Sequence, residues 1–218
     1  MQAPPPLELN PEGEIRHVVI WLHGLGADGR DFQPIVASLR LPAELGVRFV
    51  FPNAPARPVT VNGGHVMPAW YDIHGLEIDA VVDVEGILRS VDYLEKLVRS
   101  EETRGIPMEK IVLAGFSQGG LIALATALHC SGPLAGVMAL STYLPRQVMP
   151  EQPLARHIFQ AHGRLDSVVP YQVGLAARER LLSQGHEVEW REYDMAHSVC
   201  AEEVEDIRDW LLARFSGE

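Results

Sequence analysis

The chain has 218 residues, 47% of them hydrophobic, and a formal net charge of −11. This length and apolar content are sufficient for the buried core of one α/β domain. The negative charge argues against nucleic acid and against an anionic membrane surface as partners, because both attract basic proteins.

The first 14 residues are a proline-rich extension that contains Pro4, Pro5 and Pro6. They contain neither a basic segment nor an apolar helix-forming segment. We therefore expect no signal peptide, no integral membrane segment and a cytoplasmic protein. The two cysteines, Cys130 and Cys200, do not indicate a disulfide framework and fit a reducing compartment.

Apolar runs separated by helical patterns predict a mostly parallel sheet with a helix after most of its strands. Strands are expected at 17–22, 47–51, 111–114, 134–141, 157–161 and 187–193. The last of these alternates and has one polar face, which places it near an edge. Helices are expected at 31–41, with Asp31 as the N-cap or a first-turn residue, and at 79–103, 121–128, 171–184 and 199–215. No repeat or linker interrupts this order, so 1–218 is predicted to be a single doubly wound α/β domain.

Residues 52–76 show neither a helical nor a strand period, because prolines and glycines interrupt them repeatedly. We expect a long irregular segment, and such segments in compact domains are often functional. Its aromatic residues, Trp70 and Tyr71, precede Asp72. Trp70 either contributes to a site or fixes the segment to the body of the domain.

The pattern Gly115-Phe116-Ser117-Gln118-Gly119 lies between a predicted strand and a predicted helix. Strand, G-x-S-x-G and helix in this order indicate a nucleophile elbow, a turn so sharp that its flanking residues must be nearly without side chains. The serine hydroxyl is then presented beside the N–H groups at the start of a helix, where negative charge is stabilised. The alternative is a glycine-rich turn with an incidental serine.

A serine nucleophile needs a base, and the base needs an orienting carboxylate, each placed after a strand of the sheet. The best carboxylate after Ser117 is Asp166, with Asp194 as competitor, and the best base is His197. His23 lies in the first strand–helix loop and is expected to brace it. No histidine or cysteine spacing typical of a metal site occurs, so we expect no metal and no cofactor.

Two backbone N–H groups are expected to stabilise the oxyanion. One belongs to Gln118, the residue after the nucleophile, and the other to the glycine-rich loop 23–26, with Leu25 as the preferred donor.

Several blocks of the sequence together resemble the carboxylesterase/acyl-protein thioesterase family of α/β-hydrolases, and most closely its bacterial carboxylesterases. The blocks are Trp21–Asp28, Phe51–Pro55, Met67–Ile73, Gly115–Gly120, His162-Gly163 with Asp166 and Val169-Pro170, and Met195–His197. The resemblance implies an α/β-hydrolase fold without a large lid domain, a Ser117–Asp166–His197 triad and an oxyanion hole formed by Leu25 and Gln118. It also implies that segment 56–76 lies over the site, with Trp70 and Leu25 in contact with substrate, and that a homodimer is possible. Ala196 departs from the family, which usually has glycine before this histidine.

The expected activity is hydrolysis of carboxylic esters with small to medium acyl chains through an acyl-enzyme. One alternative is an acyl-protein thioesterase or lysophospholipase that acts on long-chain acyl groups, since the same groups cleave both esters and thioesters. A more remote alternative is a non-catalytic binding protein of this fold.

Overall fold

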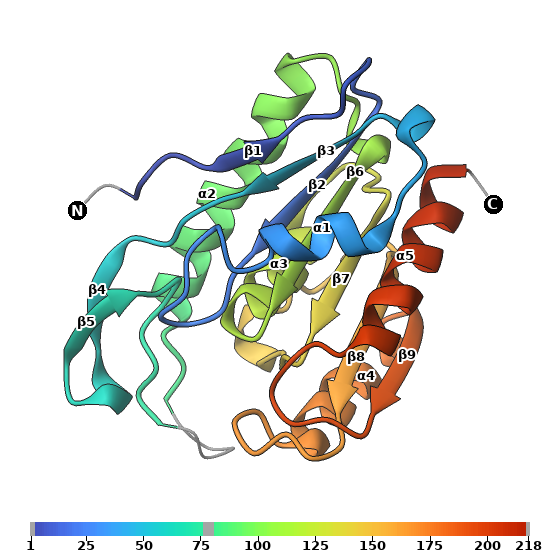
Figure 1. Cartoon of the computed structure of the whole chain (residues 1–218). Helices are drawn as coiled ribbons and strands as arrows, with labels where there is room; N and C mark the ends of the chain where they lie inside the picture. The colour runs from blue at the N-terminus through green and yellow to red at the C-terminus, as the bar shows by residue number, and fades with distance from the viewer. Residues whose placement is uncertain (1–2, 76–80, 217–218) are drawn as a thin grey trace.

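The computed structural model describes residues 3–75 and 81–216. Within these residues, seven strands form one sheet in the order β1-β3-β2-β6-β7-β8-β9 (Figure 1). β1 runs antiparallel to β3, and every other neighbouring pair is parallel. The strands of this sheet are β1 (Leu7–Leu9), β2 (His17–Leu22), β3 (Val47–Phe51), β6 (Ile111–Phe116), β7 (Gly136–Leu140), β8 (His157–Gly163) and β9 (Glu187–Tyr193). The helices are α1 (Gln33–Leu39), α2 (Val84–Thr103), α3 (Gln118–His129), α4 (Tyr171–Ser183) and α5 (Ala201–Ser216).

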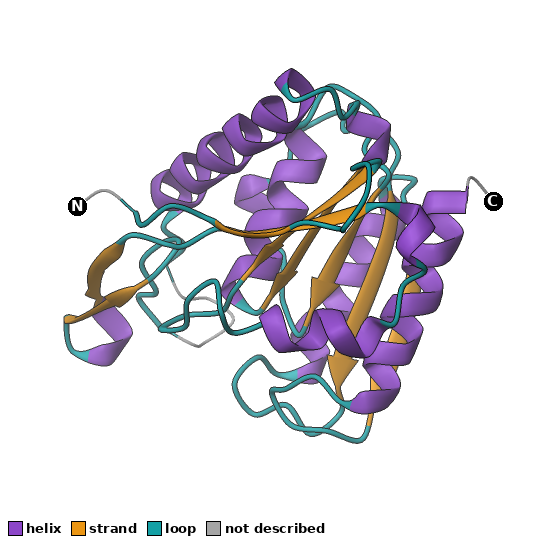
Figure 2. Ribbon diagram, turned by 45° about the horizontal axis from the view of Figure 1, so that its top comes forward, coloured by secondary structure: helices purple, strands orange, loops and turns teal. Residues whose placement is uncertain are grey.

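Helices cover both faces of the sheet and enclose two apolar cores (Figure 2). Successive side chains of a strand point to opposite faces, so a strand between two helical layers must be apolar at every position. In β2, Val18 and Ile20 enter the core with α2, α3 and α4, whereas Val19 and Trp21 enter the core with α1 and α5. This double burial is the reason for the continuous apolar run in the sequence.

The predicted strands at 17–22, 47–51 and 187–193 are confirmed with the bounds expected from the sequence. β9 is an edge strand of the sheet, as its alternating pattern indicated. Helix 79–103 is confirmed from Val84 onward, and residues 79 and 80 lie outside the described part. Its N-cap is Asp83, whose side chain accepts a hydrogen bond from the N–H of Gly86.

Two expectations for the first 40 residues are corrected by the structure. The N-terminal extension contributes a strand, because Leu7–Leu9 pair with Phe49–Phe51 of β3. Three residues are too few for a strand pattern to be recognised among prolines. Asp31 does not cap α1, which begins at Gln33 with Phe32 as N-cap and no side-chain cap. Phe32 instead stacks on Trp21 in the core.

Segment 52–76 is not wholly irregular, because it contains an antiparallel hairpin of β4 (Ala56–Val59) and β5 (His65–Pro68). The turn between the strands includes Gly63 and Gly64, both with positive φ, which glycine adopts without steric cost. Pro58 and Pro68 break the apolar alternation that would have identified the strands. Residue 76 itself lies outside the described part.

None of the helices within residues 3–75 and 81–216 combines the length and the apolar character that a membrane span requires.

Glu203, in the first turn of α5, is fully buried, and burial raises the pKa of its carboxyl group to about 8. The folded chain therefore keeps a proton that the unfolded chain releases above about pH 4.3. Because the folded state binds more protons, this group lowers stability as the pH rises from about 4.3 to about 8. Glu203→Gln has no titrating group at this position, so we expect it to avoid this pH-dependent loss of stability. The difference between the free energies of unfolding of the variant and of wild type should grow in favour of the variant by about 1.4 kcal/mol per pH unit across this window.

Urea unfolding at several pH values measures this difference. Glu202, its exposed neighbour in the same turn, provides the control, because Glu202→Gln makes the same substitution without removing a buried carboxyl group. Parallel stability curves for wild type and Glu203→Gln would contradict the prediction.

Candidate active site

Ser117 lies between β6 and α3 with φ 53° and ψ −120°, a backbone conformation that residues other than glycine rarely adopt. Its N–H donates to the carbonyl of Leu140 on the neighbouring strand at 2.8 Å, and its carbonyl accepts from Thr142 Oγ1 at 2.7 Å. Strain of this size is kept only where surrounding contacts hold it. The arrangement matches the nucleophile elbow expected from the sequence.

The glycines of the elbow are required by close backbone approach. A Cβ atom on Gly115 would lie 2.2 Å from the carbonyl oxygen of Gly119. A Cβ on Gly119 would lie 2.5 Å from the carbonyl oxygen of His23, and one on Gly120 would lie 2.8 Å from Thr142 Cβ. Any side chain at these positions would force strand and helix apart.

Loop 23–26 lies against the elbow, because a Cβ on Gly24 would be 3.6 Å from Ser117 Cβ. His23 braces this loop, as expected. Its Nε2 accepts from the N–H of Ala54 at 3.1 Å, so its Nδ1 carries the proton and donates to the carbonyl of Gly24 at 2.7 Å. Burial lowers the pKa of His23, which keeps the ring neutral.

The two expected oxyanion donors have suitable backbone positions. Gln118 is the first residue of α3, and N–H groups in the first turn of a helix have no partner within the helix. The amides of Gly26 and Ala27, which follow Leu25, are bonded to Pro68 and Gly24. The donors of Leu25 and Gln118 therefore belong to two elements that meet at Ser117.

The structure brings Asp166 and His197 together at the ends of β8 and β9. Asp166 Oδ2 accepts from His197 Nδ1 at 2.7 Å, and its Oδ1 accepts from the N–H groups of Val168 and Val169 at 2.9 and 2.8 Å. The carboxylate side chain is fully buried, and the imidazole is 15% exposed. The imidazole also packs on Phe116, directly before Ser117, with ring centroids 4.6 Å apart.

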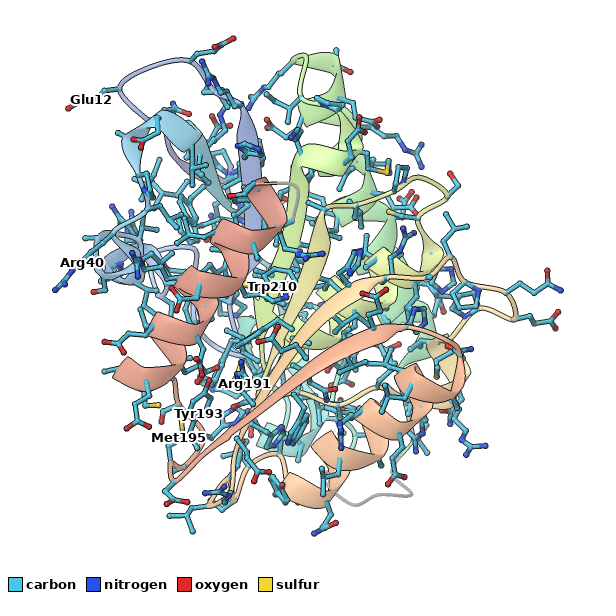
Figure 3. All side chains as sticks on the ribbon, turned by 90° about the vertical axis from the view of Figure 1, so that its right-hand side faces the viewer. Glu12, Arg40, Arg191, Tyr193, Met195 and Trp210 are labelled. Carbon is cyan, nitrogen blue, oxygen red and sulfur yellow. The ribbon has the colours of Figure 1, made fainter. Side chains whose placement is uncertain are left out.

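The loops that carry Asp166 and His197 support one another. Gly163, at the end of β8, has no room for a Cβ, which would lie 2.3 Å from the carbonyl oxygen of Met195. That carbonyl accepts from the N–H of Leu165 at 3.1 Å. Figure 3 shows Tyr193 and Met195 where β9 ends and the chain continues toward α5. Ala196 does not have a positive φ, so its methyl group is accommodated where the family usually has glycine.

Asp194, the competing carboxylate, is directed elsewhere. Its side chain is 79% exposed and forms an ion pair with Arg164 at 2.7 Å. Arg164, which follows β8, also pairs with Glu192 of β9 at 2.7 Å, so it joins the ends of the two strands at the surface. Of the two carboxylates considered from the sequence, Asp166 is the one that contacts His197.

His162 is a buried neighbour of the site that the sequence did not identify. Its Nε2 lies 2.9 Å from the carbonyl oxygen of Val169 and 3.6 Å from Asp166 Oδ2. Burial lowers its pKa, so the ring is neutral and its Nε2 donates to the carbonyl. Gly174 of α4 leaves room for the ring, since a Cβ there would be 2.4 Å from Nδ1.

Trp70 lies behind the site rather than on its open surface, because its side chain is only 1% exposed. Its indole Nε1 donates to the carbonyl of His23 at 2.9 Å. Of the two interpretations of Trp70, the structure favours the one in which it fixes its segment to the body of the domain. Leu25 is partly exposed in the loop beside Ser117.

Comparisons with known proteins agree with this architecture. The chain matches the family described as Phospholipase/Carboxylesterase over residues 9–214. It is 38% identical to acyl-protein thioesterase 1 of Neurospora crassa, with 96% of this chain and 91% of that protein aligned. It is also 38% identical to acyl-protein thioesterase 1 of Yarrowia lipolytica, with 88% of this chain and 89% of that protein aligned.

Solved structures give the same result. SOBER1 of Arabidopsis thaliana superposes with a TM-score of 0.85 at 30% identity, over 91% of this chain and 99% of that one. Acyl-protein thioesterase 2 of Zea mays superposes with a TM-score of 0.83 at 27% identity, over 96% of this chain and 98% of that one. The Bacillus cereus carboxylesterase shares the fold, with a TM-score of 0.79 at 19% identity, over 96% and 93% of the two chains. The chain is therefore a hydrolase of the phospholipase/carboxylesterase family and has its α/β-hydrolase fold.

Proposed function

We propose that the protein is an acyl-protein thioesterase-type serine hydrolase that releases long acyl chains from thioesters and also cleaves carboxylic esters. The observation that carries this proposal is the 38% identity, over most of both chains, to two proteins named acyl-protein thioesterase 1. This alternative is better supported than the carboxylesterase of small to medium acyl chains expected first from the sequence.

The proposed mechanism uses the three residues at the strand ends. His197 accepts the proton of Ser117 as the hydroxyl attacks the acyl carbonyl, and Asp166 holds the imidazole in the tautomer with Nδ1 protonated. The N–H groups of Leu25 and Gln118 stabilise the oxyanion. His197 then protonates the leaving thiolate or alkoxide and later activates water to hydrolyse the acyl-enzyme.

Apolar side chains beside the catalytic carboxylate support a long acyl substrate. Leu165 and Val168 flank Asp166 and are 67% and 48% exposed. Exposed aliphatic groups beside a reacting centre are available to contact an apolar acyl chain. Each buried methylene of an acyl chain contributes about 0.8 kcal/mol, so each added methylene would raise kcat/KM by up to about 4-fold while the chain remains in contact.

A substrate series from acetyl to palmitoyl, as p-nitrophenyl esters and as matched peptide thioesters, tests this proposal. We expect kcat/KM to rise with chain length and the palmitoyl thioester to be hydrolysed well. The Ser117→Ala variant corrects for spontaneous hydrolysis. If kcat/KM is highest for acetyl or butyryl esters and thioesters are not cleaved, the protein is a short-chain carboxylesterase. If only lysolipids are hydrolysed, it is a lysophospholipase.

We further propose that the chain is one catalytic domain that acts in the cytoplasm and can form a homodimer. The triad geometry argues against the remote alternative of a non-catalytic binding protein, since such a protein has no use for a strained serine beside a paired histidine and aspartate. Cofactors are not needed by this mechanism.

A further inference from the structure

Segment 68–71 is hydrogen-bonded to loop 23–26 on both sides of Leu25. The N–H of Gly26 donates to the carbonyl of Pro68 at 2.9 Å. The indole Nε1 of Trp70 donates to the carbonyl of His23 at 2.9 Å. One bond precedes Leu25 and the other follows it, so the orientation of the Leu25 N–H is limited by two contacts to the same short segment.

The same segment is bonded to the other half of the oxyanion hole through the side chain of Gln118. Its Oε1 accepts from the N–H of Trp70 at 2.8 Å, and its Nε2 donates to the carbonyl of Tyr71 at 2.8 Å. The amide is buried, with the residue 2% exposed, and both of its ends are used on consecutive backbone groups. Gln118 therefore contributes more than a backbone N–H to this region.

Trp70 is the residue at which these contacts meet. Its N–H, its carbonyl and its indole N–H are all bonded, the carbonyl by Ser90 Oγ of α2. The indole also packs against the His23 ring, with centroids 5.2 Å apart. A buried residue with every polar group satisfied by a different element acts as a rigid connection between those elements.

We propose that Trp70 and the side chain of Gln118 are positioning residues that fix the separation and direction of the two oxyanion donors. The inference rests on the proposed roles of Leu25 and Gln118. Donors aimed at a developing charge are effective only if they need no reorganisation during the reaction. Loss of the connection therefore reduces stabilisation of the tetrahedral intermediate while leaving the acyl-binding surface in place.

The test is Trp70→Phe, which removes the indole N–H, compared with Trp21→Phe. Trp21 is equally buried, and its Nε1 has no hydrogen-bond partner among the described residues. Trp21→Phe therefore removes the same side-chain volume as Trp70→Phe without removing a hydrogen bond. We expect Trp70→Phe to lower kcat about 10- to 100-fold with little change in KM, as a displacement near 1 Å does. Trp21→Phe should keep kcat near wild type.

Binding of an acyl trifluoromethyl ketone separates a positioning role from a merely structural one, because its adduct with serine carries an oxyanion. In Trp70→Phe the inhibition constant should rise by the same factor by which kcat/KM falls. The proposal is overturned if kcat of Trp70→Phe equals that of Trp21→Phe, or if kcat falls while ketone affinity stays at the wild-type value.

Ser90→Ala provides a second, milder variant in case Trp70→Phe does not fold, since it removes one bond to the Trp70 carbonyl. It should lower kcat and ketone affinity together by a smaller factor, and unchanged values would count against the proposal. Failure of the proposed function itself would look different. In that case the ketone would bind wild type and Ser117→Ala equally.

Discussion

Ser117→Ala is expected to reduce kcat by about a million-fold. Without the hydroxyl no acyl-enzyme forms, and His197 has no nucleophile from which to accept a proton. The remaining rate would come from binding and from the oxyanion donors alone. Release of p-nitrophenol from an ester at high enzyme concentration measures the residual activity.

Ser141→Ala is the matched control for this substitution. Ser141 follows β7, the strand next to β6, and is fully buried. Like Ser117 it is a serine with a positive φ, here 46°, so the same Ser→Ala change is made in a similar backbone conformation. We expect it to retain activity and to react with a phosphonofluoridate at Ser117, whereas Ser117→Ala should not react. A Ser117→Ala protein with more than about a tenth of wild-type activity would disprove the nucleophile assignment.

The features that the sequence predicted are those set by local pattern. Burial on both faces makes β2 a continuous apolar run from Val18 to Leu22, and the steric demands of the elbow specify glycines at fixed spacing around Ser117. Placement after a strand brought Asp166 and His197 into consideration, and the structure shows their side chains in contact, because parallel strands bring their carboxyl ends to one edge of the sheet. The position of a residue relative to a strand therefore indicates its position relative to the edge of the sheet.

The features that the sequence did not predict depend on contacts between distant segments. The hydrogen bond between the Trp70 N–H and Gln118 Oε1 joins positions 48 residues apart, and nothing in either local pattern indicates it. The local sequence left both interpretations of Trp70 open, and only the family resemblance placed it at the substrate, whereas the structure buries it behind the site. Likewise the burial of His162 beside Asp166 depends on α4, where Gly174 has no side chain and leaves room for the ring.

Asp166→Asn is expected to lower kcat by about ten-thousand-fold while the fold is retained. The N–H groups of Val168 and Val169 both point at Oδ1, so the amide oxygen of asparagine takes this position and its NH₂ group faces His197. The Nδ1 atom of His197 must then accept a hydrogen bond, which moves the ring proton to Nε2. A ring with Nε2 protonated has no free lone pair for the proton of Ser117, so the base is lost although every heavy atom stays in place.

Asp194→Asn tests the specificity of this argument, since Asp194 is three residues from His197 and was the competing carboxylate. Its charge is exposed and paired with Arg164, and such pairs contribute about 1 kcal/mol or less. We expect kcat within about 2-fold of wild type, because a rim ion pair does not set the His197 tautomer. Thermal unfolding shows whether Asp166→Asn is folded, and kcat of both variants decides the assignment. An active Asp166→Asn beside an inactive Asp194→Asn would transfer the role to Asp194, which would require the loop after β9 to rearrange so that this carboxylate reaches the imidazole.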